Sequence, residues 1–176
     1  PYSDINCLEA IRRIGLHLVE GVNAPRIENL EGLMFAGMLA GIGFGNAGCH
    51  LPHCMSYAVA GLVRDYQPDG WSQDHPLVPH GISVIMNSPA AFRFTGAACP
   101  ERHLRAAEAL GAELEDGSHE NAGAKLATRL VALMRATGLP NHSASLARLL
   151  RGLRLGTERA RPEALGGYEG VLDAGD

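Results

Sequence analysis

The sequence predicts an all-α protein, a bundle of helices. Apolar residues recur at three- and four-residue steps through most of residues 1–140, which is the period of an amphipathic helix. No segment alternates strictly between apolar and polar residues, as a half-buried strand would. With 46% hydrophobic residues, the 176-residue chain can bury one sizeable core. We therefore expect a single helical domain over residues 1–140.

The first two helices are expected on either side of Pro25. Residues 4–20 carry one apolar stripe at helical spacing, with Ser3 or Asp4 as the predicted N-cap. The segment from Gly21 to Pro25 interrupts this pattern. A second helix should start just after Pro25, and its nearly all-apolar C-terminal part should be buried. The apolar positions of this second helix are Ile27, Leu30, Met34 and Met38.

Closely spaced glycines occupy the segment from Gly41 to Gly48. Such spacing is found in dinucleotide-binding loops, but no β-branched run precedes it to form the strand that this motif requires. We therefore interpret the segment as a helix junction. A third helix is predicted over residues 47–64, and its face with His50, His53 and Tyr57 is the main candidate for a site.

The second half of the predicted domain contains three further helices. Residues 65–79 have a loop composition with three prolines, and the apolar run 82–94 then forms a helix. His80 lies at or near the start of this helix, and Pro89 is expected to kink it. One helix starts at Pro100 and another runs from Ala122 to about residue 138, which gives six helices in all.

Residues 141–176 differ in composition from the rest. We expect a short basic helix followed by a Gly- and Arg-rich loose tail. The apolar positions of the short helix are Leu146, Leu149, Leu150 and Leu153.

Charge and composition exclude several classes of function. The formal net charge of −4 and a pI near 6.1 give no basic surface for nucleic acid. No stretch has the roughly 18–20 uninterrupted apolar residues of a membrane span, so no membrane partner is expected. The four cysteines lack C-x-x-C spacing, which favours reduced thiols. Together these features predict a soluble cytoplasmic protein.

Four of the eight histidines lie between residues 50 and 80. Imidazole binds divalent metals well, and a catalytic metal site combines several such ligands with an open position for substrate. A pair such as His50 and His53 is nevertheless common by chance. Spacing alone favours histidines that are hydrogen-bonded in the core or exposed on the surface.

Two strings change this balance. Gly45 to Tyr57 reads GNAGCHLPHCMSY, and His75 to Gly81 reads HPLVPHG. Together they resemble the C-terminal signature of the iron-containing alcohol dehydrogenases, and most closely that of the hydroxyacid-oxoacid transhydrogenase branch. The resemblance covers about residues 1–140 and includes the strings Ser3-Asp4-Ile5, Asn87-Ser88-Pro89-Ala90 and Pro100-Glu101-Arg102-His103.

The resemblance implies a metal site at the cleft between a Rossmann-like NAD(P)-binding domain and a helical C-terminal domain. One Asp and three His bind the metal in that family. The third ligand lies in an H-x-M segment, matched here by His53, and the fourth in a P-H-G turn, matched by His80. The D-x-x-x-H motif with the first two ligands, and the N-terminal nucleotide-binding domain, would precede Pro1. We therefore expect this chain to lack both.

Three further residues receive lesser roles from the resemblance. Many family members have a proton-relay histidine where this chain has Tyr57, and a phenol can donate a hydrogen bond but is a poor base at neutral pH. Tyr57 is thus only a weak catalytic candidate. His50 matches no ligand position and is expected to support the ligand histidines. His75 is expected to be an exposed loop residue.

The implied function is metal-dependent, NAD(P)-linked hydride transfer on a small-molecule alcohol, hydroxyacid or oxoacid. Fe(II) is the favoured metal and Zn(II) the alternative. The chain by itself is expected to be inactive and to hold no metal tightly. It is expected to self-associate or to bind the N-terminal nucleotide-binding domain as a separate chain. The competing hypothesis is a catalytically inactive helical binding or regulatory module, in which the histidines serve only in hydrogen bonds.

Overall fold

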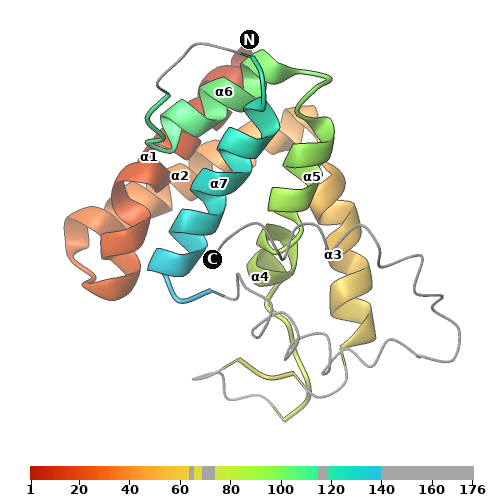
Figure 1. Cartoon of the computed structure of the whole chain (residues 1–176). Coiled ribbons are helices and arrows are strands. Elements are labelled where there is room, and N and C mark those ends of the chain that lie inside the picture. The colour runs from red at the N-terminus through yellow and green to blue at the C-terminus, as the bar shows by residue number, and fades with distance from the viewer. Residues whose placement is uncertain (64–65, 69–73, 115–118, 140–176) are drawn as a thin grey trace, which may run out of the picture.

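The computed structural model describes residues 1–63, 66–68, 74–114 and 119–139. Within these residues the chain forms helices and no strand, which confirms the all-α prediction (Figure 1). The predicted short helix around Leu146 and the predicted tail lie outside them. The helices are α1 (Tyr2–Asn23), α2 (Ile27–Ala47), α3 (Leu51–Leu62), α4 (His80–Ile85), α5 (Ser88–Thr95), α6 (Pro100–Ala109) and α7 (Ala122–Ala136).

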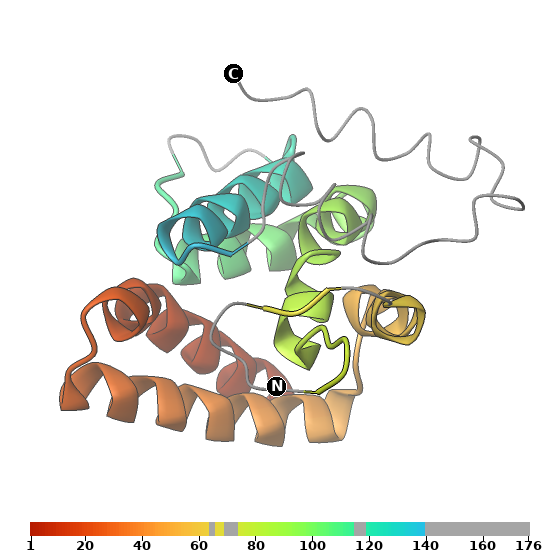
Figure 2. The ribbon, with the colours of Figure 1, turned by 90° about the horizontal axis from the view of Figure 1, so that it is seen from below.

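The helices are arranged in two layers. Figure 2 shows α1 and α2 side by side in one layer, and α5, α6 and α7 together in the other. α4 leads from the side of α3 toward α5, and α3 lies at the edge of the molecule. The main core forms where α6 and α7 pack on each other and on α1. Its buried members are Ala107, Leu110, Leu126 and Leu133.

α1 begins earlier than the sequence suggested. Pro1 occupies the N-cap position without a side-chain hydrogen bond, so the prediction of Ser3 or Asp4 as cap is wrong. Asp4 has a different partner, because Arg102 of α6 donates to both of its carboxylate oxygens at 3.0 and 3.1 Å. This ion pair links the first turn of α1 to the layer formed by α5, α6 and α7. The sequence around Asp4 does not indicate this contact.

A small network of polar side chains links α1 and α2, and the two helices also lie close together at a glycine. The Nδ1 of His17 donates to the Oδ1 of Asn29 at 3.1 Å, and the amide of Asn29 donates to Glu20 at 3.2 Å. Asn29 is buried, so these bonds satisfy a side chain that would otherwise be costly to bury. A Cβ at Gly32 would collide with the ring of His17, so glycine sets the distance between the helices here.

Much of the apolar surface of α2 is exposed. Met38 and Phe44 are each 51% exposed, so the expected burial of the C-terminal part of this helix is wrong. The reason is that α1 is the only helix with which α2 packs extensively among the described residues. By length and composition alone, α2 also meets the requirements for crossing a membrane. Helices from the cores of globular proteins meet the same requirements.

A junction and a break position the smaller helices. Gly48 ends α2 with φ +79, a left-handed conformation that glycine adopts without strain. The single helix expected over residues 82–94 is in fact two, because α4 ends at Ile85 and α5 begins at Ser88. Pro89 lies in the first turn of α5, where its missing N–H is not needed. The helix is therefore interrupted just before Pro89, where the sequence predicted only a kink.

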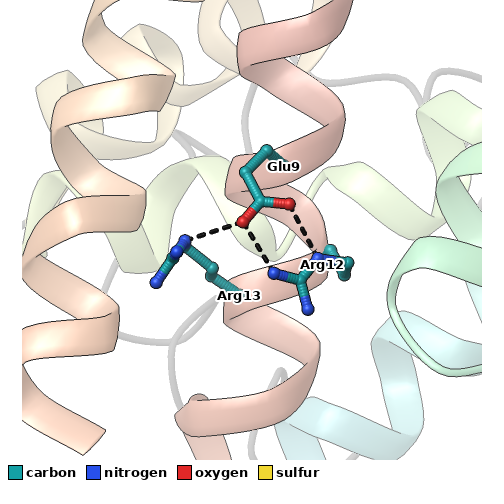
Figure 3. Close-up of polar contacts among 3 residues, drawn as sticks. All are labelled: Glu9, Arg12 and Arg13. Carbon is teal, nitrogen blue, oxygen red and sulfur yellow. Dashed lines mark hydrogen bonds and ion pairs between the residues drawn. The ribbon is translucent and has the colours of Figure 1, made fainter. Parts of the chain in front are cut away.

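Glu9 accepts hydrogen bonds from two arginines on the same helix (Figure 3). Arg12 donates to both of its oxygens at 2.6 and 2.7 Å, and Arg13 donates at 2.9 Å. The hydrogen bonds from Arg12, followed by the charges of Arg12 and Arg13, lower the pKa of Glu9 from 4.5 to about 2. The stabilisation from this cluster is thus complete above pH 4.5 and is lost as the pH falls toward 2.

We expect the Glu9→Gln variant to be slightly less stable than the original chain at pH 6, because it lacks this ionised carboxylate. The difference in unfolding free energy between the two proteins should be small, since the three side chains are partly exposed to solvent. This difference should disappear as the pH is lowered through the range of the shifted pKa. Urea unfolding of both proteins from pH 6 to pH 2 measures it, and a difference that does not change with pH would contradict the lowered pKa of Glu9.

Candidate metal centre

The two histidines predicted as metal ligands lie close together. His53 is in the first turn of α3, and His80 is the first residue of α4. Their ring centroids are 5.3 Å apart, with the ring planes at 60°. The long loop between α3 and α4 thus returns the chain so that two residues distant in sequence face each other.

Each of these histidines is anchored in the same way. The hydroxyl of Ser56 donates to the carbonyl of His53 at 2.7 Å, and the hydroxyl of Ser83 donates to the carbonyl of His80 at 2.8 Å. Both serines are almost fully buried, with 1% and 0% exposure. Each bond lies within one helix and satisfies a buried hydroxyl on the carbonyl three residues before it. The turn that carries each imidazole therefore has a buried and satisfied inner side.

A small second core holds α3 and α4 together. Val78, in the loop just before α4, is its buried centre, with 3% exposure. The N–H of Leu77 donates to the carbonyl of Tyr66 at 2.9 Å and ties the two ends of the loop to each other. This core thereby sets the distance between His53 and His80. The partly buried residues packed on it are Val59, Val63, Tyr66, Ile82 and Met86.

The geometry of the pair fits a shared metal ion. Imidazole nitrogens bind Zn²⁺ at about 2.0–2.1 Å, so two rings on one tetrahedral ion have centroids roughly 5 Å apart. Within the part of the chain that the structure describes, no ring nitrogen of His53 or His80 has a hydrogen-bond partner. The same part contains no group of three or more His, Cys, Asp or Glu residues that could hold a metal. The described residues therefore provide two imidazole ligands for a metal ion.

The other predicted site residues lie apart from the pair. Tyr57 lies one turn after His53 and is 70% exposed. His50 occupies the N-cap position of α3, and its ring stacks on Phe92 at 6.3 Å rather than on either imidazole of the pair. His75 is an exposed loop residue, as expected, and its Nδ1 lies 2.8 Å from Asp74. Hydrogen bonding to His75 lowers the pKa of the Asp74 carboxyl.

Phe92 and His103 are structural neighbours of the site that the sequence did not reveal. The ring of Phe92 is stacked with that of His50, and its centroid lies 5.7 Å from that of His103 with the ring planes at 80°. His103 is fixed by both ring nitrogens, with Nδ1 2.8 Å from the carbonyl of Cys99 and Nε2 3.0 Å from the hydroxyl of Thr95. A row of rings thus connects α6 through α5 to the start of α3. An apolar run and one histidine carry no sequence signal for such a row.

Comparison with known proteins identifies relatives of this arrangement. Residues 1–147 match the model of the Fe-containing alcohol dehydrogenase family, C-terminal. The hydroxyacid-oxoacid transhydrogenase of Xenopus laevis is 48% identical over 131 residues, which is 74% of this chain and 28% of that protein. The human protein of the same name is 47% identical over the same shares, so the chain spans about a quarter of the length of these relatives. The relatives are named mitochondrial, which contradicts the expected cytoplasmic location.

Solved structures agree with this assignment. A 1,3-propanediol oxidoreductase superposes with a TM-score of 0.71 and 27% identity over 85% of this chain and 35% of its own. An alcohol dehydrogenase from Oenococcus oeni has the same fold, with a TM-score of 0.67 and 24% identity over 99% of this chain and 40% of its own. The match of the family model over residues 1–147 and the shared helical fold place this chain in the Fe-containing alcohol dehydrogenase family.

Proposed function

We propose that this chain forms the metal-binding helical part of an NAD(P)-linked oxidoreductase that acts on small alcohols or hydroxyacids. The observation that carries the proposal is the pair of opposed imidazoles, His53 and His80, each anchored by a buried serine. Fe(II) is the metal that the family description favours, and Zn(II) is the alternative. The names of the relatives suggest a hydroxyacid and an oxoacid as substrates.

The residues of the chain have separate tasks in this proposal. His53 and His80 would hold the ion, which when bound would polarise a substrate oxygen as a Lewis acid while a nicotinamide exchanges the hydride. Ser56 and Ser83 bond to the backbone of the turn that carries each imidazole, and the core around Val78 keeps the two turns together. Tyr57, exposed one turn after His53, would donate a hydrogen bond to a substrate oxygen. The remaining ligands and the nucleotide site would lie outside the residues that the structure describes.

Metal titration of the chain tests the proposal directly. Two protein ligands leave the other coordination positions to water, so binding should be too weak to survive gel filtration. NMR should nevertheless show Co(II) broadening the ring signals of His53 and His80 at lower metal concentration than those of His75. The selective broadening of His80 should disappear in the His53→Ala variant, because the pair would be broken.

His75→Ala serves as the matched control for this titration. His75 is an exposed histidine of the same loop, and its removal should leave the broadening of His53 and His80 unchanged. Equal broadening of all three histidines would show that the pair has no preference for the ion and would refute the proposal. Binding tight enough to survive gel filtration would refute the two-ligand count.

A further inference from the structure

The position of Phe92 is set by the layer formed by α5, α6 and α7. Its partly buried ring packs against the main core. Its backbone lies so close to α7 that a Cβ at Gly123 would collide with the carbonyl oxygen of Phe92. Phe92 is therefore a ring on a closely packed part of the molecule, and neighbouring side chains can be held in place against it.

His103 keeps its ring in one orientation beside Phe92. The two ring planes meet at 80°, the edge-to-face arrangement that aromatic pairs prefer. The Nδ1 of His103 lies 2.8 Å from the carbonyl oxygen of Cys99, which can only accept, so this nitrogen carries a hydrogen. The Nε2 lies 3.0 Å from the hydroxyl of Thr95. Both nitrogens therefore fix the ring of His103 and with it one neighbour of Phe92.

His50 connects Phe92 to the start of α3. The rings of His50 and Phe92 are nearly parallel, with 14° between their planes and 6.3 Å between their centroids. The carbonyl of His50 accepts the N–H of His53 at 3.0 Å, so His50 begins the turn that carries the imidazole of His53. α3 packs mainly on α4, and its contact with α5 is smaller. The stack thus links this turn to the main body of the molecule.

The orientation of His53 needs such a support. A metal-binding histidine usually donates its second ring N–H to a neighbouring acceptor, which fixes the direction of the ring. Among the described residues, no ring nitrogen of His53 or His80 has a hydrogen-bond partner. The direction of the His53 imidazole therefore depends on the turn from which it projects.

We propose that Phe92 and His50 are positioning residues for the imidazole of His53. Their stack holds the first turn of α3 against α5, and the turn in turn directs His53 toward His80. Neither residue binds the ion, and His50 acts through the face of its ring rather than through its nitrogens. This inference rests on the proposed binding of a metal by His53 and His80.

Substitutions of His50 separate the stack from a direct ligand role. His50 is exposed, so its replacement leaves the main core intact. In the Co(II) titration of the full chain, His50→Ala should raise the midpoint of His53 broadening about tenfold, the lower end of the cost of losing a group that orients a ligand. His50→Phe keeps a ring to stack on Phe92 and should keep the original midpoint. A higher midpoint in both variants would identify His50 as a ligand, and no change in either would remove it from the site. Both outcomes would overturn the proposal.

Phe92→Leu and Phe94→Leu form a matched pair on α5. Leucine at position 92 fills apolar space but cannot stack, so this variant should raise the midpoint as His50→Ala does. Phe94 is 81% exposed and has no ring contact within the described residues, so the same substitution there should leave the midpoint unchanged. Phe92→Leu combined with His50→Ala should bind Co(II) no more weakly than His50→Ala alone, because both changes remove one stack. Additive losses would contradict a shared role.

Amide exchange without metal tests the positioning separately from the proposed function. The hydrogen bond from the N–H of His53 to His50 should open about two- to tenfold more often in His50→Ala, as expected for the loss of one aromatic pair. NMR gives the exchange rate of the His53 amide, and His50→Phe should restore the original rate. An unchanged rate in His50→Ala would overturn the inference even if the original chain binds Co(II) at the pair. Faster exchange in this variant, without selective broadening in the original chain, would instead refute the proposed metal site.

Discussion

Replacing His53 by alanine should lower the transhydrogenase activity of a chimera by more than about 100-fold. The chimera carries the 131 residues of this chain that match the Xenopus laevis relative in place of the corresponding segment of that protein. Loss of a residue that only supports a metal ligand typically costs about 10–100-fold, so loss of a ligand should cost more. The rate of oxoacid formation and the metal content of the purified protein are the quantities to measure.

Two further variants of this chimera sharpen the test. His80→Ala should match His53→Ala in both activity and metal content, because the two imidazoles would share one ion. Tyr57→Phe keeps the ring and removes only the hydroxyl, so it should retain metal and lose no more than about tenfold in rate. Normal activity and metal content without His53 would eliminate the metal-ligand proposal and favour the competing hypothesis, in which the histidines serve only in hydrogen bonds.

Replacing Gly123 by alanine should destabilise the chain although alanine is the better helix former. A Cβ at this position would collide with the carbonyl oxygen of Phe92 and lie 3.0 Å from the Cα of Gly96. Both contacts are with backbone atoms, one in α5 and one in the residue that follows it, so no side-chain rotation can relieve them. Overpacking costs about 1–3 kcal/mol, against a gain of roughly 0.5–1 kcal/mol from the higher helix propensity of alanine. The steric cost should therefore prevail.

Gly37→Ala is the matched control for Gly123→Ala. Gly37 also lies inside a helix, but a Cβ there would have no atom within 4 Å. This variant should gain up to about 1 kcal/mol from helix propensity alone. The propensity gain is common to both variants, so urea unfolding should separate them by the overpacking cost alone, about 1–3 kcal/mol. Similar unfolding free energies would mean that α5 and α7 can move apart at little cost.

Local patterns predicted most of the helices but not their partners. The stripes of residues 4–20 and 122–138 gave α1 and α7 to within a turn, because a buried helix face repeats in the sequence. The break before Pro89 was predicted only as a kink, since an apolar run does not show where backbone hydrogen bonding stops. The exposure of Met38 and Phe44 could not be predicted, because it depends on which helices lie opposite α2.

The candidate site was predicted from a resemblance rather than from spacing. His53 and His80 are too far apart in sequence for any helical period to connect them. Their proximity depends on Val78 and on the contact between Leu77 and Tyr66, which tie the loop ends together. The role of His50 as an N-cap residue stacked on Phe92 was likewise hidden, because stacking partners on different helices have no signature in sequence.

The small core around Val78 has a consequence for how the molecule opens. α3 and α4 are held to each other mainly by this core, while α1, α5, α6 and α7 share the larger one around Leu126. Amide hydrogens of α3 and α4 should therefore exchange with solvent through local opening, faster than those of α7. An ion bound by His53 and His80 would slow that exchange selectively, so metal binding and the folding of this corner would be one coupled equilibrium.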